Sequence, residues 1–232
     1  MSPFTLSPQE WQAFWLSLDV AARSVIFSLP VAVAVAWVLA RRRFLGRTVV
    51  DAFVHLPLVL PPVVVGYFLL LLFGTRGPVG GWLKDTFGLQ FVFTTAGAAL
   101  ATAVMSFPLV VRAIRLSIEN IDPGLEEAAR TLGARTLDRF FSITLPLMAP
   151  GVLVGAVVAF SASLGEFGAV ITFASNIPGE TQTLPLSLYT ALQTPNGDVA
   201  AARLATVSVG LGLAGLLAAE WIARALRRRF GR

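Results

Sequence analysis

The sequence contains no cysteine and few charged residues. The absence of cysteine excludes disulfides and thiolate metal sites. The single histidine, His55, has no second histidine or cysteine to join it, so no metal site is predicted. Charged residues make up only 13% of the chain, hydrophobic residues make up 56%, and the mean hydropathy is +0.75. This composition is typical of an integral membrane protein.

The basic residues favour a membrane topology over nucleic-acid binding. The net charge is +5, but the basic residues cluster at the ends of apolar segments. We therefore expect a lipid bilayer, and no nucleic acid, around this chain.

Five apolar segments are long enough to cross a bilayer core of about 30 Å, which requires roughly 20 helical residues. They are residues 14–40, 52–73, 91–111, 145–174 and 200–223. The sequence thus predicts an all-α membrane protein of five spans, with six as the alternative count. The fourth segment is long enough to be tilted or broken.

The positions of lysine and arginine predict the orientation. Fourteen of the 18 basic residues fall in three stretches, 41–47, 112–139 and 224–232, whereas the loops between them hold only Arg76 and Lys84. Basic loops stay in the cytoplasm. We expect the N-terminus outside, the C-terminus inside and one transmembrane domain over residues 1–232.

The polar segment at about 122–145 is expected on the cytoplasmic side. Asp122 and Pro123 predict a helix start, and Glu126 and Glu127 suit the positive end of the helix dipole. Gly133 predicts a bend before a second helix. The small alanines and paired glutamates fit close protein contact better than an anionic lipid surface.

The same segment resembles the EAA signature of ABC-importer permeases. The matching residues are Glu127, Ala128, Ala129, Gly133, Ile143, Leu145 and Pro146. The resemblance implies a MetI-like permease fold. It also implies that these residues, with Glu126 and Leu132, form a coupling helix that docks on a cytoplasmic ATPase.

Under this resemblance the chain has no catalytic site and binds no cofactor, and ATP-Mg is used by the partner. The stretch "GGWLKDT" around Lys84 also lacks the spacing of a phosphate-binding loop. We therefore expect the ATPase to be a separate polypeptide.

Two further stretches carry candidate gate, pathway or structural residues. Pro61 and Pro62 fall inside the second segment, where proline kinks a helix. Glu166 falls inside the fourth segment, near its outer end, where it is a candidate for an ion pair with Arg23 or Arg203 or for substrate contact. Because a carboxylate repels an anionic substrate, a gating or structural role is favoured over substrate binding.

The outer stretch "NIPGETQTLPL" (176–186) resembles the molybdate permeases within the molybdate/sulfate branch of ABC importers. The resemblance adds Asn176, Thr181, Gln182 and Thr183 as candidate residues. It implies a homodimer in a prokaryotic cytoplasmic membrane, served by a periplasmic or lipid-anchored oxyanion-binding protein. Tungstate has the same shape and charge as molybdate and remains a second candidate cargo.

Two alternatives stay open. A sulfate or thiosulfate permease would share most of these features. A proton-coupled secondary transporter could use Glu166, but it should show more buried carboxylates and inverted repeats.

Small residues at 151, 155, 159 and 163, and at 208 and 212, predict close helix packing without defining a dimer face.

Overall fold

The computed structural model describes residues 5–230, so Arg232 lies outside the described residues. All regular elements in this range are helical, in agreement with the predicted class. They are α1 (Pro8–Arg41), α2 (Arg47–Val59), α3 (Pro62–Phe73), α4 (Pro78–Phe87), α5 (Thr95–Glu119), α6 (Pro123–Thr131), α7 (Thr136–Arg139), the π-helical turn η1 (Phe140–Thr144), α8 (Leu145–Leu164), α9 (Gly168–Phe173), α10 (Leu184–Gln193) and α11 (Asp198–Phe230).

Within the described residues, four helical stretches have the length and hydropathy of a span, and a bent helix pair is the fifth candidate. The four are Pro8–Arg41, Thr95–Glu119, Thr136–Leu164 and Asp198–Ile222. The bent pair is α2 and α3, whose axes differ by 117°. The sequence had predicted one span over residues 52–73, and the structure instead places two helices there, joined at a sharp bend.

The helices also differ from the expected bounds. The first span begins at Pro8, because Ser7 forms a capping box: its hydroxyl accepts from the Glu10 N–H at 3.2 Å, and the Glu10 carboxylate accepts from the Ser7 N–H at 2.6 Å. Arg23 consequently lies near the middle of α1 and not near its outer end. The third span continues to Glu119, so Arg112 and Arg115 belong to α5 and not to the following loop.

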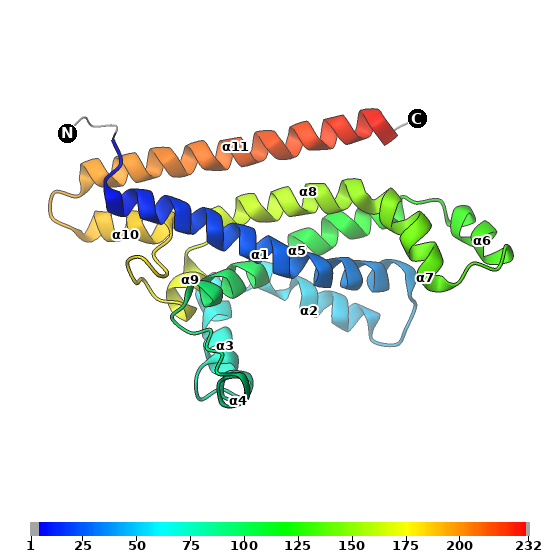
Figure 1. Ribbon diagram of the computed structural model, residues 1–232, viewed down its shortest axis with the longest axis horizontal. Helices are drawn as coiled ribbons and strands as arrows, with labels where there is room; N and C mark the ends of the chain where they lie inside the picture. Colours follow the sequence, from blue (N-terminus) through cyan, green and yellow to red (C-terminus); the bar gives the residue numbers. More distant parts are fainter. Residues whose placement is uncertain (1–4, 231–232) are drawn as a thin grey trace.

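The core is built by α1, α5 and α8, which lie side by side in Figure 1. Its inner cluster combines Ala32, Ala36 and Leu39 of α1 with Val110, Val111, Ile114 and Ile118 of α5 and with Met148 and Ala159 of α8. A second cluster around Phe173 joins α9 to α3, α5 and α10. Helix α11 runs along the outside of α8 and exposes leucines, as expected of a lipid-facing helix.

The small-residue stripe of α8 packs helices of the same chain. A Cβ on Gly151 would lie 2.3 Å from the Ser117 Cβ, and one on Gly155 would lie 3.3 Å from the Ala113 Cβ, both on α5. Ser163 lies 3.4 Å from Ser24 of α1, oxygen to oxygen. Without a hydrophobic drive in lipid, such close approach is what holds helices together.

The two ends of the molecule carry different segments. The arginine-rich loop after α1, the α6–α7 segment and the end of α11 lie at one end in Figure 1, and the starts of α1 and α11 lie at the other. The three stretches predicted to be cytoplasmic thus share one end of the bundle.

The packing of α8 on α5 gives a stability prediction. Gly151→Ala should destabilise the purified protein by about 2 kcal/mol, because its methyl group overlaps the Ser117 side chain. The expected readout is a lower melting temperature in detergent.

Gly212→Ala on α11 is the matched control, since a Cβ there meets no described atom within 4 Å. It should be neutral or slightly stabilising, because alanine restricts the unfolded chain. Equal melting temperatures for the two variants would contradict the packing role of Gly151.

Candidate functional site

The polar segment between α5 and α8 forms the predicted helix–bend–helix unit at one tip of the molecule (Figure 1). Asp122 caps α6, its carboxylate accepting from the Gly124 N–H at 2.8 Å, and Pro123 takes the first helical position. Gly133 follows α6 with φ +87°, in the left-handed region that favours glycine. This glycine reverses the chain toward α7, as the sequence had predicted.

One side of this unit presents apolar side chains to solvent. Leu132 is 87% exposed and Leu137 is 70% exposed, and Leu125 and Phe141 are also exposed. Ala128 and Glu127 are exposed beside them. Exposed apolar side chains bordered by charged residues, here Glu127, Arg130 and Arg135, are typical of a protein-docking surface.

Glu126, next in sequence to Glu127, points into the molecule instead. Its Oε1 lies 3.0 Å from the Arg41 Nη2 at the end of α1 and accepts a hydrogen bond of 3.0 Å from the Thr144 hydroxyl. Both charged side chains are about four-fifths buried, at 20% and 17% exposure. The two adjacent glutamates, grouped together by sequence, thus face opposite environments.

The second half of the unit leads directly into the membrane span. Asp138 accepts from the Arg135 N–H at 3.1 Å and so caps the short helix α7. The chain then forms the π-helical turn η1, in which Ile143 is half-buried, and continues into α8. Leu145 packs against the inner core and Pro146 opens α8 at its exposed side. The last residues of the signature therefore connect this polar unit to a core helix without a break.

Two helix breaks meet on the other side of the core. The first is at Leu60 and Pro61, between α2 and α3, and Pro62 starts α3. The second is at residues 165–167, between α8 and α9, so the long fourth segment is broken. A Cβ on Gly168 would lie 2.7 Å from the Pro62 Cβ, so the two breaks are in contact.

Glu166 lies in the second break, where it serves the backbone. Its carboxylate accepts from the Ala169 N–H at 2.9 Å at the start of α9. The expected ion pair with Arg23 or Arg203 is wrong: Arg23 pairs with Asp19 at 2.9 Å, and Arg203 pairs with Glu10 at 2.9 Å. Asp19 lies one helical turn before Arg23, a local pairing that the sequence already indicates, whereas Glu10 and Arg203 are 193 positions apart and only the fold brings them together.

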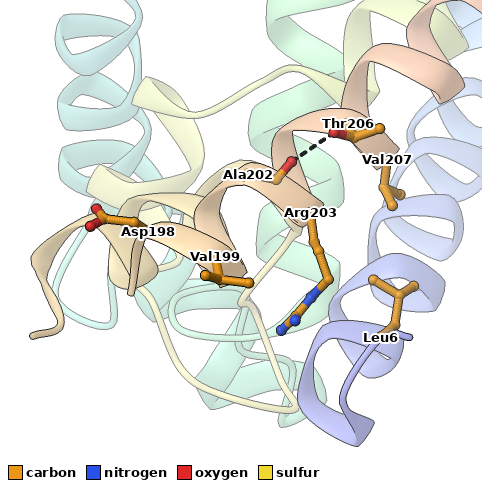
Figure 2. A pocket seen from close by; sticks show the side chains of 7 residues that line it. All are labelled: Leu6, Asp198, Val199, Ala202, Arg203, Thr206 and Val207. Atoms are coloured by element: carbon orange, nitrogen blue, oxygen red, sulfur yellow. Dashed lines mark hydrogen bonds between the residues drawn. The ribbon is translucent and has the colours of Figure 1, made fainter. Parts of the chain in front are cut away.

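Figure 2 shows the surroundings of Arg203, which points from α11 toward the start of α1, beside Leu6. The pocket there has a volume of about 520 Å³ and is lined mainly by apolar side chains. The ion pair between Arg203 and Glu10 ties the outer ends of α1 and α11 together.

The polar residues of the outer stretch form two local networks. Gln182 donates to the Asn176 side-chain oxygen at 3.0 Å, and both side chains contact the Thr190 hydroxyl of α10. Thr181 is buried and bridges the Ile177 N–H and the Ser175 carbonyl. Thr183 is buried directly before α10. These residues shape the outer loop, and their roles as gate or pathway residues stay predictions.

A cavity of about 880 Å³ lies between α1, α2 and α5. Most of its lining is apolar, and Arg23, Ser24 and Ser28 supply its polar groups from one face of α1. Sequence reasoning missed this site. Ser24 and Ser28, four residues apart with Arg23 beside them, form a polar face on an apolar helix. This face indicates a cavity only once α2 and α5 are placed against it.

The comparison with known families settles what this architecture belongs to. Residues 28–230 match the family described as binding-protein-dependent transport system inner membrane component. The chain belongs to this family. It is therefore a multi-pass inner-membrane component of an ABC importer, which works with a binding protein and an ATPase and carries no catalytic site of its own.

Similar proteins agree over almost the whole chain. The molybdenum transport system permease protein ModB of Escherichia coli (strain K12) is 57% identical over 98% of this chain and 99% of that protein. ModB of Haemophilus influenzae is 54% identical, covering 96% and 97%. The sulfate transport system permease protein CysT of Escherichia coli is 37% identical, covering 97% of this chain and 79% of that one.

Solved structures support the fold. A bacterial ABC transporter that imports alginate superimposes with a TM-score of 0.72 at 20% identity, covering 98% of this chain and 82% of that one. The MetNI methionine ABC transporter gives a TM-score of 0.65 at 19% identity, covering 93% of each chain. The predicted ABC importer permease fold is confirmed.

The exposed surface of α6 gives a binding prediction. Glu127→Arg should leave the protein in the membrane but reduce the amount of ATPase that co-purifies with it by about tenfold, because a reversed charge at a docked surface costs more than 1 kcal/mol. The measurement is the ATPase-to-permease ratio after affinity purification.

Asp85→Arg is the matched control, an exposed charge reversal on α4 at a different part of the molecule. Its ATPase ratio should equal that of the unaltered protein. An unchanged ratio in Glu127→Arg would exclude this surface as the docking site.

Proposed function

We propose that this chain is the permease subunit of an ATP-driven molybdate importer. The observation that carries the proposal is the 57% identity over 98% of the chain to a permease named for molybdenum transport. The identity to the sulfate permease CysT is lower, at 37%. Tungstate shares the charge and shape of molybdate and is included as a second cargo.

The proposed assembly contains two copies of this chain, each bound to one ATPase subunit. A periplasmic or lipid-anchored binding protein delivers the oxyanion to the outer loops. The coupling segment 122–145, with Glu127, Ala128, Leu132 and Gly133 at its exposed side, docks on the ATPase. ATP-Mg acts in that partner, and this chain itself makes and breaks no bond.

The cavity between α1, α2 and α5 is our candidate for part of the cargo route. This cavity borders the broken second span, and broken helices line substrate sites in many transporters. Arg23 lines this cavity at the middle of α1, where its guanidinium also pairs with Asp19 at 2.9 Å. An ionisable group within a span marks a pathway more often than a packing site, and a cation suits an anionic cargo.

The proposal is tested by the ATPase activity of the reconstituted complex. With its binding protein loaded with molybdate, ATP hydrolysis should rise severalfold over the unloaded state, with tungstate acting similarly and sulfate much less. The physical reason is that the loaded binding protein favours the conformation in which the coupling segments bring the ATPase subunits together.

Uptake into vesicles without ATP would instead identify a secondary transporter. Stimulation by sulfate or thiosulfate but not by molybdate would overturn the proposed cargo while leaving the family unaffected. The control is the same complex with an ATPase unable to hydrolyse ATP. An ATP-driven importer in this form should take up neither molybdate nor sulfate.

A further inference from the structure

The inner end of α1 contacts both halves of the coupling segment. Trp37 and Arg41 are four residues apart and so lie on one face of the helix. The Trp37 ring meets the Phe140 ring of η1 edge to face at 5.8 Å between centroids. The Arg41 guanidinium meets the Glu126 carboxylate of α6 at 3.0 Å.

Helix α6 has little else to fix its position. Every residue of α6 is at least partly exposed in the described chain, and Figure 1 shows α6 at the tip, beyond the ends of α1, α5 and α8. The contacts of Glu126 therefore decide the angle at which this helix is presented. They are also well placed to do so, because they reach α1 through Arg41 and the start of α8 through Thr144.

The ion pair between Arg41 and Glu126 is largely buried, as a structural contact requires. Thr144 is 1% exposed, and the Arg41 guanidinium also lies 3.5 Å from the Ile121 carbonyl, where α5 has just ended. Partly buried charges are screened less than surface charges, and removal of one leaves the other buried without its partner. The contacts of Arg41 and Glu126 thus connect α1, the end of α5, α6 and the start of α8.

Helix α1 carries this connection to the other end of the molecule. It has 34 residues, roughly 51 Å of helix. Toward its outer end, the Ser17 hydroxyl accepts from the N–H of Leu184, a residue of the outer stretch 176–186, at 2.7 Å. The ion pair of Glu10 with Arg203 holds the same end to α11. One helix therefore contacts both the outer loop and the coupling segment.

We propose that Arg41 and Glu126 are positioning residues that tie the coupling helix to α1, so that α6 and the spans move as one unit. Glu126 acts through Arg41 and Thr144 and not by touching the ATPase, in contrast to Glu127. This inference rests on the proposed function, since it describes how that transporter is coupled.

The test uses the reconstituted importer with its ATPase and molybdate-loaded binding protein. Arg41→Glu and Glu126→Arg should each reduce the molybdate taken up per ATP hydrolysed by about fivefold or more, the lower end of usual coupling effects. The ATPase should still co-purify with both variants. The double variant Arg41→Glu/Glu126→Arg, which restores an opposite-charge pair, should recover most of the ratio.

Glu220→Arg is the matched control, because it reverses the charge of a carboxylate that pairs with Arg224 at 2.7 Å on α11, outside this set of contacts. It should leave the ratio unchanged. If Glu126 touched the ATPase directly, the double variant would be no better than Glu126→Arg, and this result would overturn the proposal. The proposal would also be overturned if the single variants took up as much molybdate per ATP hydrolysed as the unaltered complex.

The outcomes separate this inference from the proposed function. An unaltered complex that does not respond to molybdate contradicts the proposed cargo, whatever the variants do. If the single variants do not reach the membrane, the amount of the double variant in the membrane is compared with theirs. A recovered amount supports the Arg41–Glu126 pair, and an equal loss in all three variants overturns the proposal.

Discussion

A bilayer offers no water to unpaired backbone groups, and this constraint governs the whole chain. It makes every described element helical and makes any interruption of a helix costly. The two interruptions at 60–61 and 165–167 are tolerated because each lies against the other, with Gly168 beside Pro62 and the Glu166 carboxylate on the Ala169 N–H. These two interruptions therefore lie in one region of the molecule.

Close packing supplies the stability that the hydrophobic effect cannot provide between helices in lipid. Gly151 and Gly155 allow α8 to approach α5, and small residues of α1 face both. The result is a rigid group of three helices. The remaining membrane elements, α2, α3 and α11, contribute fewer buried side chains to the core.

Charged groups are placed where this rigid group meets its surroundings. At the outer end, Glu10 and Arg203 join α1 to α11, and at the inner end, Arg41 and Glu126 join α1 to the docking helix. The exposed Glu127 and Leu132 remain available to a partner. The same short stretch therefore contains one residue that pairs inward with α1 and neighbours that face outward, on the surface proposed to dock on the ATPase.

The sequence by itself determined the class, the family resemblance, the cytoplasmic unit from Asp122 to Pro146 and the bend at Gly133. Each of these follows from hydropathy, from the positions of arginine or from local helix signals, which act over a few residues. The start of α1 at Pro8 and the pairing of Arg23 with Asp19 also rest on local signals that the sequence itself carries, a capping box and an i,i+4 spacing. Only the tertiary structure decided how far the second span bends at its prolines and that Arg203 pairs with Glu10. It alone also turned Glu126 inward and left Glu127 outside. These outcomes depend on which helices come to lie side by side, and contacts between residues 85 or more positions apart leave no periodic signal in the chain.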